Sequence, residues 1–205
     1  GIREAQTDRL VEEVRQGALD AAVVALPVEE SAVTAVALFD DRFLLAGSAG
    51  RLAALEAAAP RAEEVRPEEL LLLDEGHCLS EQALAACALD PARARIDLRA
   101  ASLTTLCRLV SEGFGLTLLP ELAAPAECAA APALRLVRFA APEPQRTVGL
   151  VRRRTSVDAG WFGELADILA SAGRAVIGRQ RGDGHATIAA DFSQLTPYHA
   201  PPKRG

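Results

Sequence analysis

Apolar residues recur along this chain at two spacings, one typical of strands and one typical of helices. Short apolar runs predict strands at 21–26, 36–39, 43–46, 70–73, 116–119, 134–139 and 148–151. Between them, apolar positions that repeat on one helical face predict helices at 7–17, 51–59, 81–89, 103–112 and 158–172. Because strands and helices alternate, the sequence predicts an α/β fold whose strands pair mostly in parallel.

Local signals predict the ends of several elements. Thr7 is the expected N-cap of the first helix, and Gly17 is its expected end. The run at 21–26 is wholly apolar, which is typical of a parallel strand covered on both faces. The clearest helix is 103–112, which Ser102 can cap and Gly113 can end.

Composition and charge narrow the class of protein. Half of the 205 residues are apolar but only 4% are aromatic, so the core must consist of Leu, Val and Ala. The net charge of −6 argues against nonspecific binding of nucleic acid by this segment. No apolar stretch is long enough to cross a membrane, and four cysteines without a secretion signal indicate the cytoplasm. From about Gly178 the pattern fades, and we expect 178–205 to form a flexible tail.

The segment 70–88 carries the most distinctive chemistry. A buried strand is followed by acidic residues, a turn at Gly76, His77 and Cys78, and a helix that begins near Ser80. Cys78 is therefore expected at a helix N-terminus, where unpaired N–H groups, the helix dipole and a protonated His77 favour the thiolate. This is the environment of a reactive cysteine. From the spacing alone, a small buried hydrophobe beside a turn histidine is an equally good interpretation.

Cys87 follows Cys78 after nine residues, and helix geometry keeps the two thiols apart. Nine residues of continuous helix advance about 13–14 Å, whereas a disulfide needs Cα atoms roughly 4.4–6.8 Å apart. If the two cysteines pair, residues 79–86 must unwind. Such a disulfide would fix a second conformation of the chain and would act as a switch.

The stretch GHCLSEQALAAC resembles the redox segment of the OxyR group of LysR-type transcriptional regulators, which carries GHCLRDQAL and a second cysteine at the same interval. Further stretches match in the same order: EAQT at 4–7, ALFDD at 37–41, ASLTTL at 101–106, EGFGLTLLP at 112–120 and PEPQRTVGLV at 142–151. The resemblance covers residues 3–173. It implies the two-lobed fold of LysR regulatory domains, which is similar to that of periplasmic binding proteins.

By this resemblance, residues 1–39 and 147–177 form the first lobe, residues 40–146 form the second, and 178–205 is the tail. The chain begins with Gly1 and contains no Met, so we expect a fragment of a longer protein. The family's winged helix-turn-helix, its linker helix, and the first strand and helix of the regulatory domain are expected to be missing.

The resemblance also implies roles for single residues. Cys78 would be the peroxidatic cysteine that hydrogen peroxide oxidises, and Cys87 would be the resolving cysteine that then forms the disulfide. Thr7 and His77 would help to line the peroxide pocket. Arg146 matches the family arginine expected to stabilise the thiolate.

Some positions depart from the family pattern. Glu81 stands where the family usually has Asp, and its side chain is one methylene longer. The resemblance therefore does not fix the pocket geometry at this position. Ser80 and Gln145 each replace a family arginine. Cys107 and Cys128 match no redox position and are interpreted as apolar filler or surface thiols. Neither a metal nor a cofactor is expected.

The expected function is that of a cytoplasmic redox sensor, not an enzyme, that switches transcription of oxidative-stress genes when hydrogen peroxide oxidises it. Expected partners are further copies of itself in a dimer or tetramer, with 103–110 and 116–119 as candidate contacts, and a thiol reductant such as glutaredoxin or thioredoxin. Promoter DNA would be bound only through the missing domain, and RNA polymerase only by the full-length regulator. No membrane partner is expected.

Two other function classes stay open. A LysR-type effector domain could bind a small organic ligand, and its cysteines would then be incidental; the spacing of Cys78 and Cys87 beside His77 argues against this. A Cys-His thiol enzyme needs a base that reaches its nucleophile, which an adjacent histidine seldom does. Catalytic turnover with peroxide and thioredoxin would separate an enzyme from a sensor.

Overall fold

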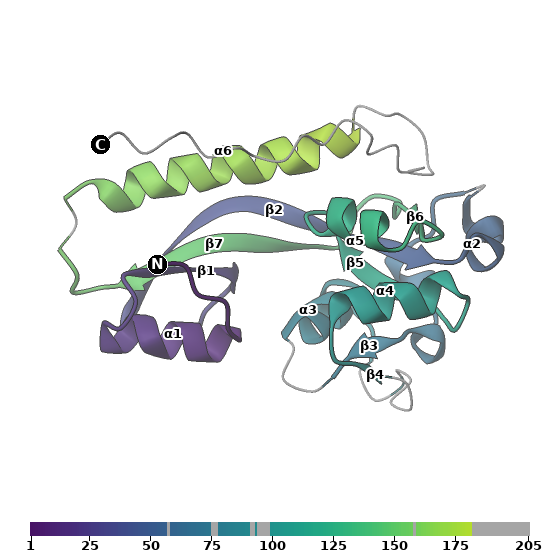
Figure 1. Cartoon of the computed structure of the whole chain (residues 1–205), viewed down its shortest axis with the longest axis horizontal. Helices are drawn as coiled ribbons and strands as arrows, with labels where there is room; N and C mark the ends of the chain where they lie inside the picture. Colours follow the sequence, from purple (N-terminus) through teal and green to yellow (C-terminus); the bar gives the residue numbers. More distant parts are fainter. Residues whose placement is uncertain (57, 75–77, 91–92, 94–98, 158, 182–205) are drawn as a thin grey trace.

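The computed structural model describes residues 1–56, 58–74, 78–90, 93, 99–157 and 159–181. Its helices are α1 (Thr7–Gln16), α2 (Ala49–Glu56), α3 (Cys78–Ala86), α4 (Leu103–Ser111), α5 (Ala124–Ala130) and α6 (Trp161–Arg181), with short 3-10 helices at Ala62–Glu64 and Pro67–Glu69. Its strands are β1 (Ala21–Leu26), β2 (Val33–Gly47), β3 (Leu72–Leu73), β4 (Arg99–Ala100), β5 (Thr117–Pro120), β6 (Arg135–Val137) and β7 (Gln145–Arg153). Helices and strands are mixed along the chain, so the predicted α/β class is confirmed (Figure 1).

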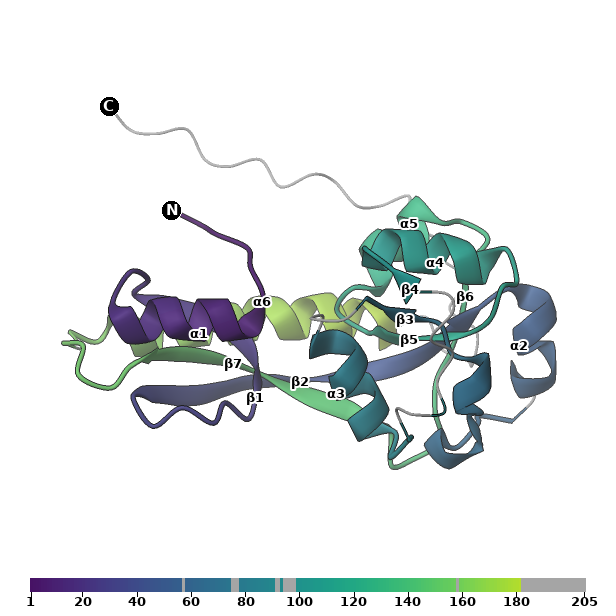
Figure 2. The same cartoon turned by 90° about the horizontal axis from the view of Figure 1, so that it is seen from below.

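The long strand β2 connects the two ends of the molecule (Figures 1 and 2). Its first part pairs with β7, which also pairs with the edge strand β1, and its second part pairs with β5 and β6. All of these pairs are antiparallel, so the prediction of mostly parallel pairing is wrong. Parallel pairing joins β3 to β4 and Leu70 to Leu116. The partners are distant in sequence, and local apolar patterns do not encode which strands will meet.

Helices α1 and α6 cover opposite faces of the sheet formed by β1, β7 and the first part of β2 (Figure 1). Val14 of α1 is buried against one face of this sheet, and Leu150 of β7 is buried in the cluster that α6 covers on the other. On β1, Val24 faces the core below α1, whereas Val23 is 46% exposed. The prediction of a parallel strand covered on both faces is therefore wrong, because β1 is an antiparallel edge strand whose face around Val23 is exposed.

The second part of β2 is buried on both faces. Phe43 and Leu45 belong to the core cluster below α2 and α3, whereas Leu44 and Ala46 belong to the cluster below α4 and α5. All four side chains are fully buried. Because successive side chains point to opposite faces of a strand, four consecutive apolar residues fit a strand with helices on both sides. This double-sided core holds α3 in place.

The predicted caps of α4 are confirmed. Ser102 Oγ accepts a hydrogen bond from the Thr105 amide at 3.2 Å, and Gly113 follows the helix with a φ of 88°. The helix turns Leu106 and Val110 into the chain's own core, and β5 is buried as well. The suggested role of these segments as contacts between copies is therefore not supported by their burial.

Other element boundaries differ from the sequence prediction. The predicted strands 36–39 and 43–46 are parts of the single strand β2. Helix α6 extends to Arg181, so the first residues of the predicted tail are helical, and 182–205 lies outside the described residues. Helix α5 was not predicted, because its alanine-rich sequence has no clear apolar stripe. Within the part of the chain that the structure describes, no helix is both long and apolar enough to span a membrane.

Candidate redox site

Cys78 is the first residue of α3 and is partly buried. A hydrogen bond joins its Sγ to Thr7 Oγ1 at 3.3 Å. The amides of the first helical turn have no partner within the helix, so the sulfur lies at the positive end of the helix dipole. This placement agrees with the predicted helix N-terminus, although the helix begins two residues before Ser80.

Thr7 does not cap α1, and this prediction is wrong. Gln6 occupies the N-cap position without a side-chain capping bond, and Thr7 is the first helical residue. Its hydroxyl bonds Cys78, 71 positions away in sequence. The local preference of Thr for caps concealed a long-range contact. The contact joins α1 to α3 directly.

Arg146 on β7 connects three elements. Its Nε and Nη2 donate to Asp41 Oδ2 at 3.1 and 2.9 Å, and its Nη1 donates to Gln82 Oε1 at 3.1 Å. Asp41 is fully buried in β2, and its Oδ1 accepts the amide of Leu122 at 2.9 Å. Gln82 stands four residues after Cys78 and so lies on the same side of α3. Arg146 therefore faces the Cys78 side of the helix while a buried carboxylate balances its charge.

The other predicted site residues are placed differently. Glu81 is an exposed residue of α3, and its neighbour Gln82 makes the contact with Arg146. One residue of helix turns a side chain by about 100°, so adjacent positions face different directions. His77 lies outside the described residues. Ser80, where the family has arginine, accepts the Leu73 amide at 3.0 Å and ties α3 to β3.

Cys87 follows the last residue of α3 and is 2% exposed within the cluster below α2 and α3. Its amide donates to the Ala83 carbonyl at 3.1 Å, so the helical hydrogen bonding continues to this residue. Burial raises the pKa of the Cys87 thiol to about 12. Cys78 and Cys87 are free thiols at opposite ends of one helix. Cys87 can meet Cys78 only after α3 unwinds.

Cys107 and Cys128 are also free and buried, in the cluster below α4 and α5. Burial raises the pKa of Cys107 to about 12 and that of Cys128 to about 11. Both residues serve as apolar filler, as one of the two sequence interpretations has it. Among the described residues, no cluster of His, Cys, Asp and Glu could hold a metal ion.

Sequence reasoning missed Asp41 and Gln82. Asp41 is one of three charged residues, Asp40, Asp41 and Arg42, between Phe39 and Phe43, and the sequence does not show which of them is buried and needs a partner. Gln82 gave no local signal. The one indication in the sequence was the position of Gln82 about one helical turn after Cys78.

Comparison with known proteins bears on this geometry. The family model of the LysR substrate-binding domain matches residues 1–173. The chain belongs to this family. A probable hydrogen peroxide-inducible genes activator of Mycobacterium avium is 44% identical over 169 residues, which cover 82% of this chain and 54% of that protein. The chain thus spans about half the length of this curated relative.

Solved structures of OxyR proteins are similar to this one. The reduced regulatory domain of Vibrio vulnificus OxyR2 is 29% identical with a TM-score of 0.72, covering 82% of this chain and 79% of that one. A cysteine variant of Corynebacterium glutamicum OxyR with bound H2O2 is 31% identical with a TM-score of 0.75, covering 89% and 58%. The resemblance to the OxyR group is confirmed. These relatives are named as regulators and not as enzymes.

Proposed function

We propose that this chain is the hydrogen peroxide-sensing domain of a transcription regulator, with Cys78 as the peroxidatic and Cys87 as the resolving cysteine. The observation that carries the proposal is the Thr7–Cys78 contact at the start of a helix whose other end holds Cys87. The names of the related regulators support it.

Two chemical steps follow. The Cys78 thiolate attacks one peroxide oxygen, the O–O bond breaks, and sulfenic acid and hydroxide form. The Cys87 sulfur then attacks the sulfenic sulfur, the S–O bond breaks, the disulfide forms, and the hydroxyl group leaves with the thiol proton as water. Cys78 is at the more accessible end of the helix, whereas Cys87 is buried as a protonated thiol, so the order of the two steps is set by exposure.

The second step requires α3 to unwind. Unwinding one or two packed helical turns costs a few kcal/mol. A disulfide that closes a loop of about ten residues lowers the free energy of the closed loop by roughly 2–3 kcal/mol relative to the unwound, unlinked segment. These quantities are similar, so oxidation can move the chain from one conformation to the other. Thr7, His77 and Arg146 would shape the pocket around the first step, and the exposed Glu81 would lie at its edge.

The remaining assignments belong to the same proposal. Residues 1–39 with 147–177 form one lobe and 40–146 form the other, with the crossing strands β2 and β7 between them. The sensor works in the cytoplasm, self-associates as a dimer or tetramer, and is reset by a thiol reductant. Promoter DNA and RNA polymerase are bound by the full-length regulator, and the domain itself does not turn over substrate.

Mass spectrometry of peroxide-treated protein tests the proposal. We expect the wild type to form a Cys78–Cys87 disulfide, Cys78→Ser to form none, and Cys87→Ser to stop at Cys78 sulfenic acid. Cys107→Ser and Cys128→Ser serve as matched controls and should react like the wild type. The proposal is wrong if Cys78 stays reduced, or if it pairs with Cys107 or Cys128. Sustained peroxide turnover with thioredoxin would indicate an enzyme instead.

A further inference from the structure

Helix α3 ends in a backbone cap that holds one residue in an unfavourable conformation. The Ala88 amide donates to the Ala85 carbonyl at 3.1 Å, and the Leu89 amide donates to the Leu84 carbonyl at 2.9 Å. This pair of hydrogen bonds is the Schellman motif, which places Ala88 at the position that is usually glycine. Ala88 has a φ of 52°, and it is the one residue other than glycine with a positive φ in the described part of the chain.

The left-handed conformation of Ala88 weakens this end of the helix. In this conformation the Cβ atom lies too close to the following carbonyl oxygen, a contact that glycine avoids. Ala88 is exposed, so its methyl group gains no packing that offsets the steric cost. The cap forms because Leu84 belongs to the cluster that buries Cys87 and Leu89 packs against the same cluster.

The two ends of α3 are held by different kinds of contact. In the first half, Cys78, Ser80 and Gln82 each form a side-chain hydrogen bond, to α1, β3 and β7 respectively. Residues 83–89 are alanine, leucine and cysteine, so apolar packing and backbone hydrogen bonds hold the second half. The Cys87 end is therefore the end that depends on the strained cap.

We propose that α3 unwinds from its Cys87 end, and that the left-handed conformation of Ala88 sets how readily this end opens. Opening the cap releases the strain at Ala88 and frees Cys87 from the cluster, while Cys78 stays against Thr7. Ala88 is thus a positioning residue that acts through Cys87. The inference rests on the proposed function, in which the two cysteines form a disulfide, and adds which thiol moves and what controls the movement.

Native-state hydrogen exchange of the reduced chain tests the direction of unwinding without peroxide. The amides of Cys87, Ala88 and Leu89 are protected only while the second half of the helix and its cap are closed. The Gln82 amide is protected by the first half, where a helical amide bonds the carbonyl four residues earlier. We expect lower protection factors at residues 87–89 than at Gln82. Equal protection, or the reverse order, overturns the proposal.

Substitutions of the exposed Ala88 change the backbone preference and remove no buried contact. Ala88→Gly should slow the disulfide step about threefold, because the relief of the steric contact exceeds the freedom that glycine adds to the unwound segment. Ala88→Asn should act in the same direction, since Asn tolerates the left-handed region, and the β-branched Ala88→Val should speed the step. Sulfenic acid formation at Cys78 should keep the same rate in all three variants.

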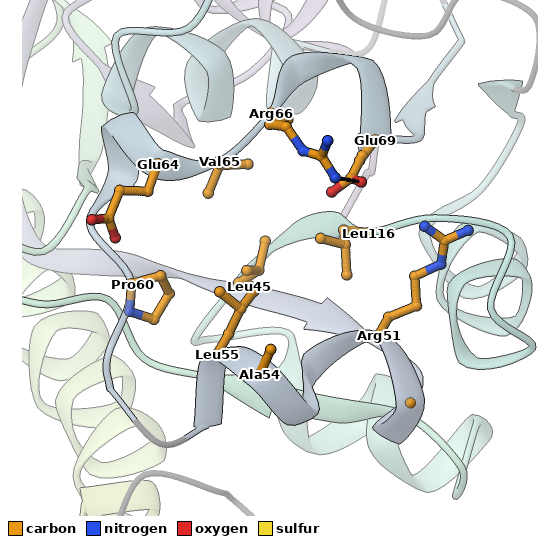
Figure 3. Close-up of a pocket in the computed structure, with 11 residues that line it drawn as sticks. Leu45, Arg51, Ala54, Leu55, Pro60, Glu64, Val65, Arg66, Glu69 and Leu116 are labelled. Carbon is orange, nitrogen blue, oxygen red and sulfur yellow. Dashed lines mark hydrogen bonds and ion pairs between the residues drawn. The ribbon is translucent and has the colours of Figure 1, made fainter.

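Two further alanine-to-glycine changes serve as matched controls. Ala85 is exposed within α3, where glycine weakens the helix, so Ala85→Gly should speed the disulfide step. The same change three positions apart should therefore act in opposite directions. Ala54 of α2 is exposed and lines a pocket whose described lining residues all lie outside α3 (Figure 3). Ala54→Gly should leave the disulfide step unchanged.

The kinetic result that contradicts the proposal is an Ala88→Gly variant whose disulfide step is as fast as in the wild type or faster. Slowing in Ala88→Val would contradict it as well. A wild type that forms no Cys78–Cys87 disulfide would instead refute the proposed function, and the exchange order of the reduced chain would still decide from which end α3 unwinds.

Discussion

Arg146 donates two hydrogen bonds to one oxygen of Asp41, and their separation of 105 positions in sequence makes this a tertiary contact. Asp41 has no exposed surface, whereas the Arg146 side chain is 19% exposed. The pair joins the two strands β2 and β7, one position before the end of their pairing at Arg42 and Gln145. Because Arg146 also donates a hydrogen bond to Gln82, the Asp41–Arg146 pair connects α3 to strands β2 and β7.

Removing either partner of this pair should destabilise the chain unequally. Arg146→Met leaves the buried Asp41 carboxylate with only the Leu122 amide, and we expect a loss of about 3 kcal/mol in the free energy of unfolding. Asp41→Asn should cost less, because Arg146 keeps Gln82 and some solvent contact. Urea denaturation of the reduced variants measures both. A larger loss in Asp41→Asn than in Arg146→Met contradicts the argument.

Replacing Thr7 by Val should slow peroxide oxidation of Cys78. Valine keeps the shape of threonine but removes the hydroxyl that contacts the sulfur at 3.3 Å. A hydrogen bond to a charged group contributes about 1.5 kcal/mol or more, so the rate should fall by about tenfold. Thr7→Ser keeps the hydroxyl and should stay close to the wild-type rate. Stopped-flow or quenched labelling of Cys78 measures the rate, and equal rates in the Val and Ser variants would refute the role of the hydroxyl.

The sequence predicted what neighbouring residues determine. Ser102 and the apolar stripe of α4 define that helix within a dozen positions, and the helix forms as expected. The pairing of β1 with β7 was missed because its partners lie more than a hundred residues apart. The same reason explains why Thr7 was interpreted as a cap and why Asp41 was not connected to Arg146. The resemblance to a known family, not local pattern, pointed to Thr7 and Arg146 as site residues.

The buried thiols should make stability fall at high pH. Burial raises their pKa, to about 12 for Cys87 and Cys107 and about 11 for Cys128, from an ordinary value near 9. Because the unfolded chain loses these protons first, the stability linked to them is complete below pH 9 and is lost as the pH rises through the window from 9 to 12. Each thiol should lower the free energy of unfolding by roughly 1 kcal/mol per pH unit within that window.

Urea denaturation between pH 8 and 10.5, with a phosphine reductant, measures this slope. The chain has one lysine, Lys203, and one tyrosine, Tyr198, so few other groups titrate in the same range. Cys107→Ala removes one buried thiol. It should reduce the slope of the free energy of unfolding against pH by the contribution of one thiol, whatever its effect on stability at pH 8. An unchanged slope in Cys107→Ala would show that burial of this thiol is not linked to stability.

Weakening α3 without touching either cysteine should speed the disulfide step of the proposed switch. Ala85 is exposed on α3, so Ala85→Gly removes no buried contact but costs the helix about 1 kcal/mol in propensity. The unwound form then becomes roughly fivefold more populated, and at saturating peroxide the disulfide should form about fivefold faster after sulfenic acid has formed. Rapid quenching and mass spectrometry separate the two steps.

Ala53→Gly makes the same change at an exposed position of α2 and should leave both rates unchanged. If Ala85→Gly also leaves the disulfide rate unchanged, the unwinding of α3 does not limit that step.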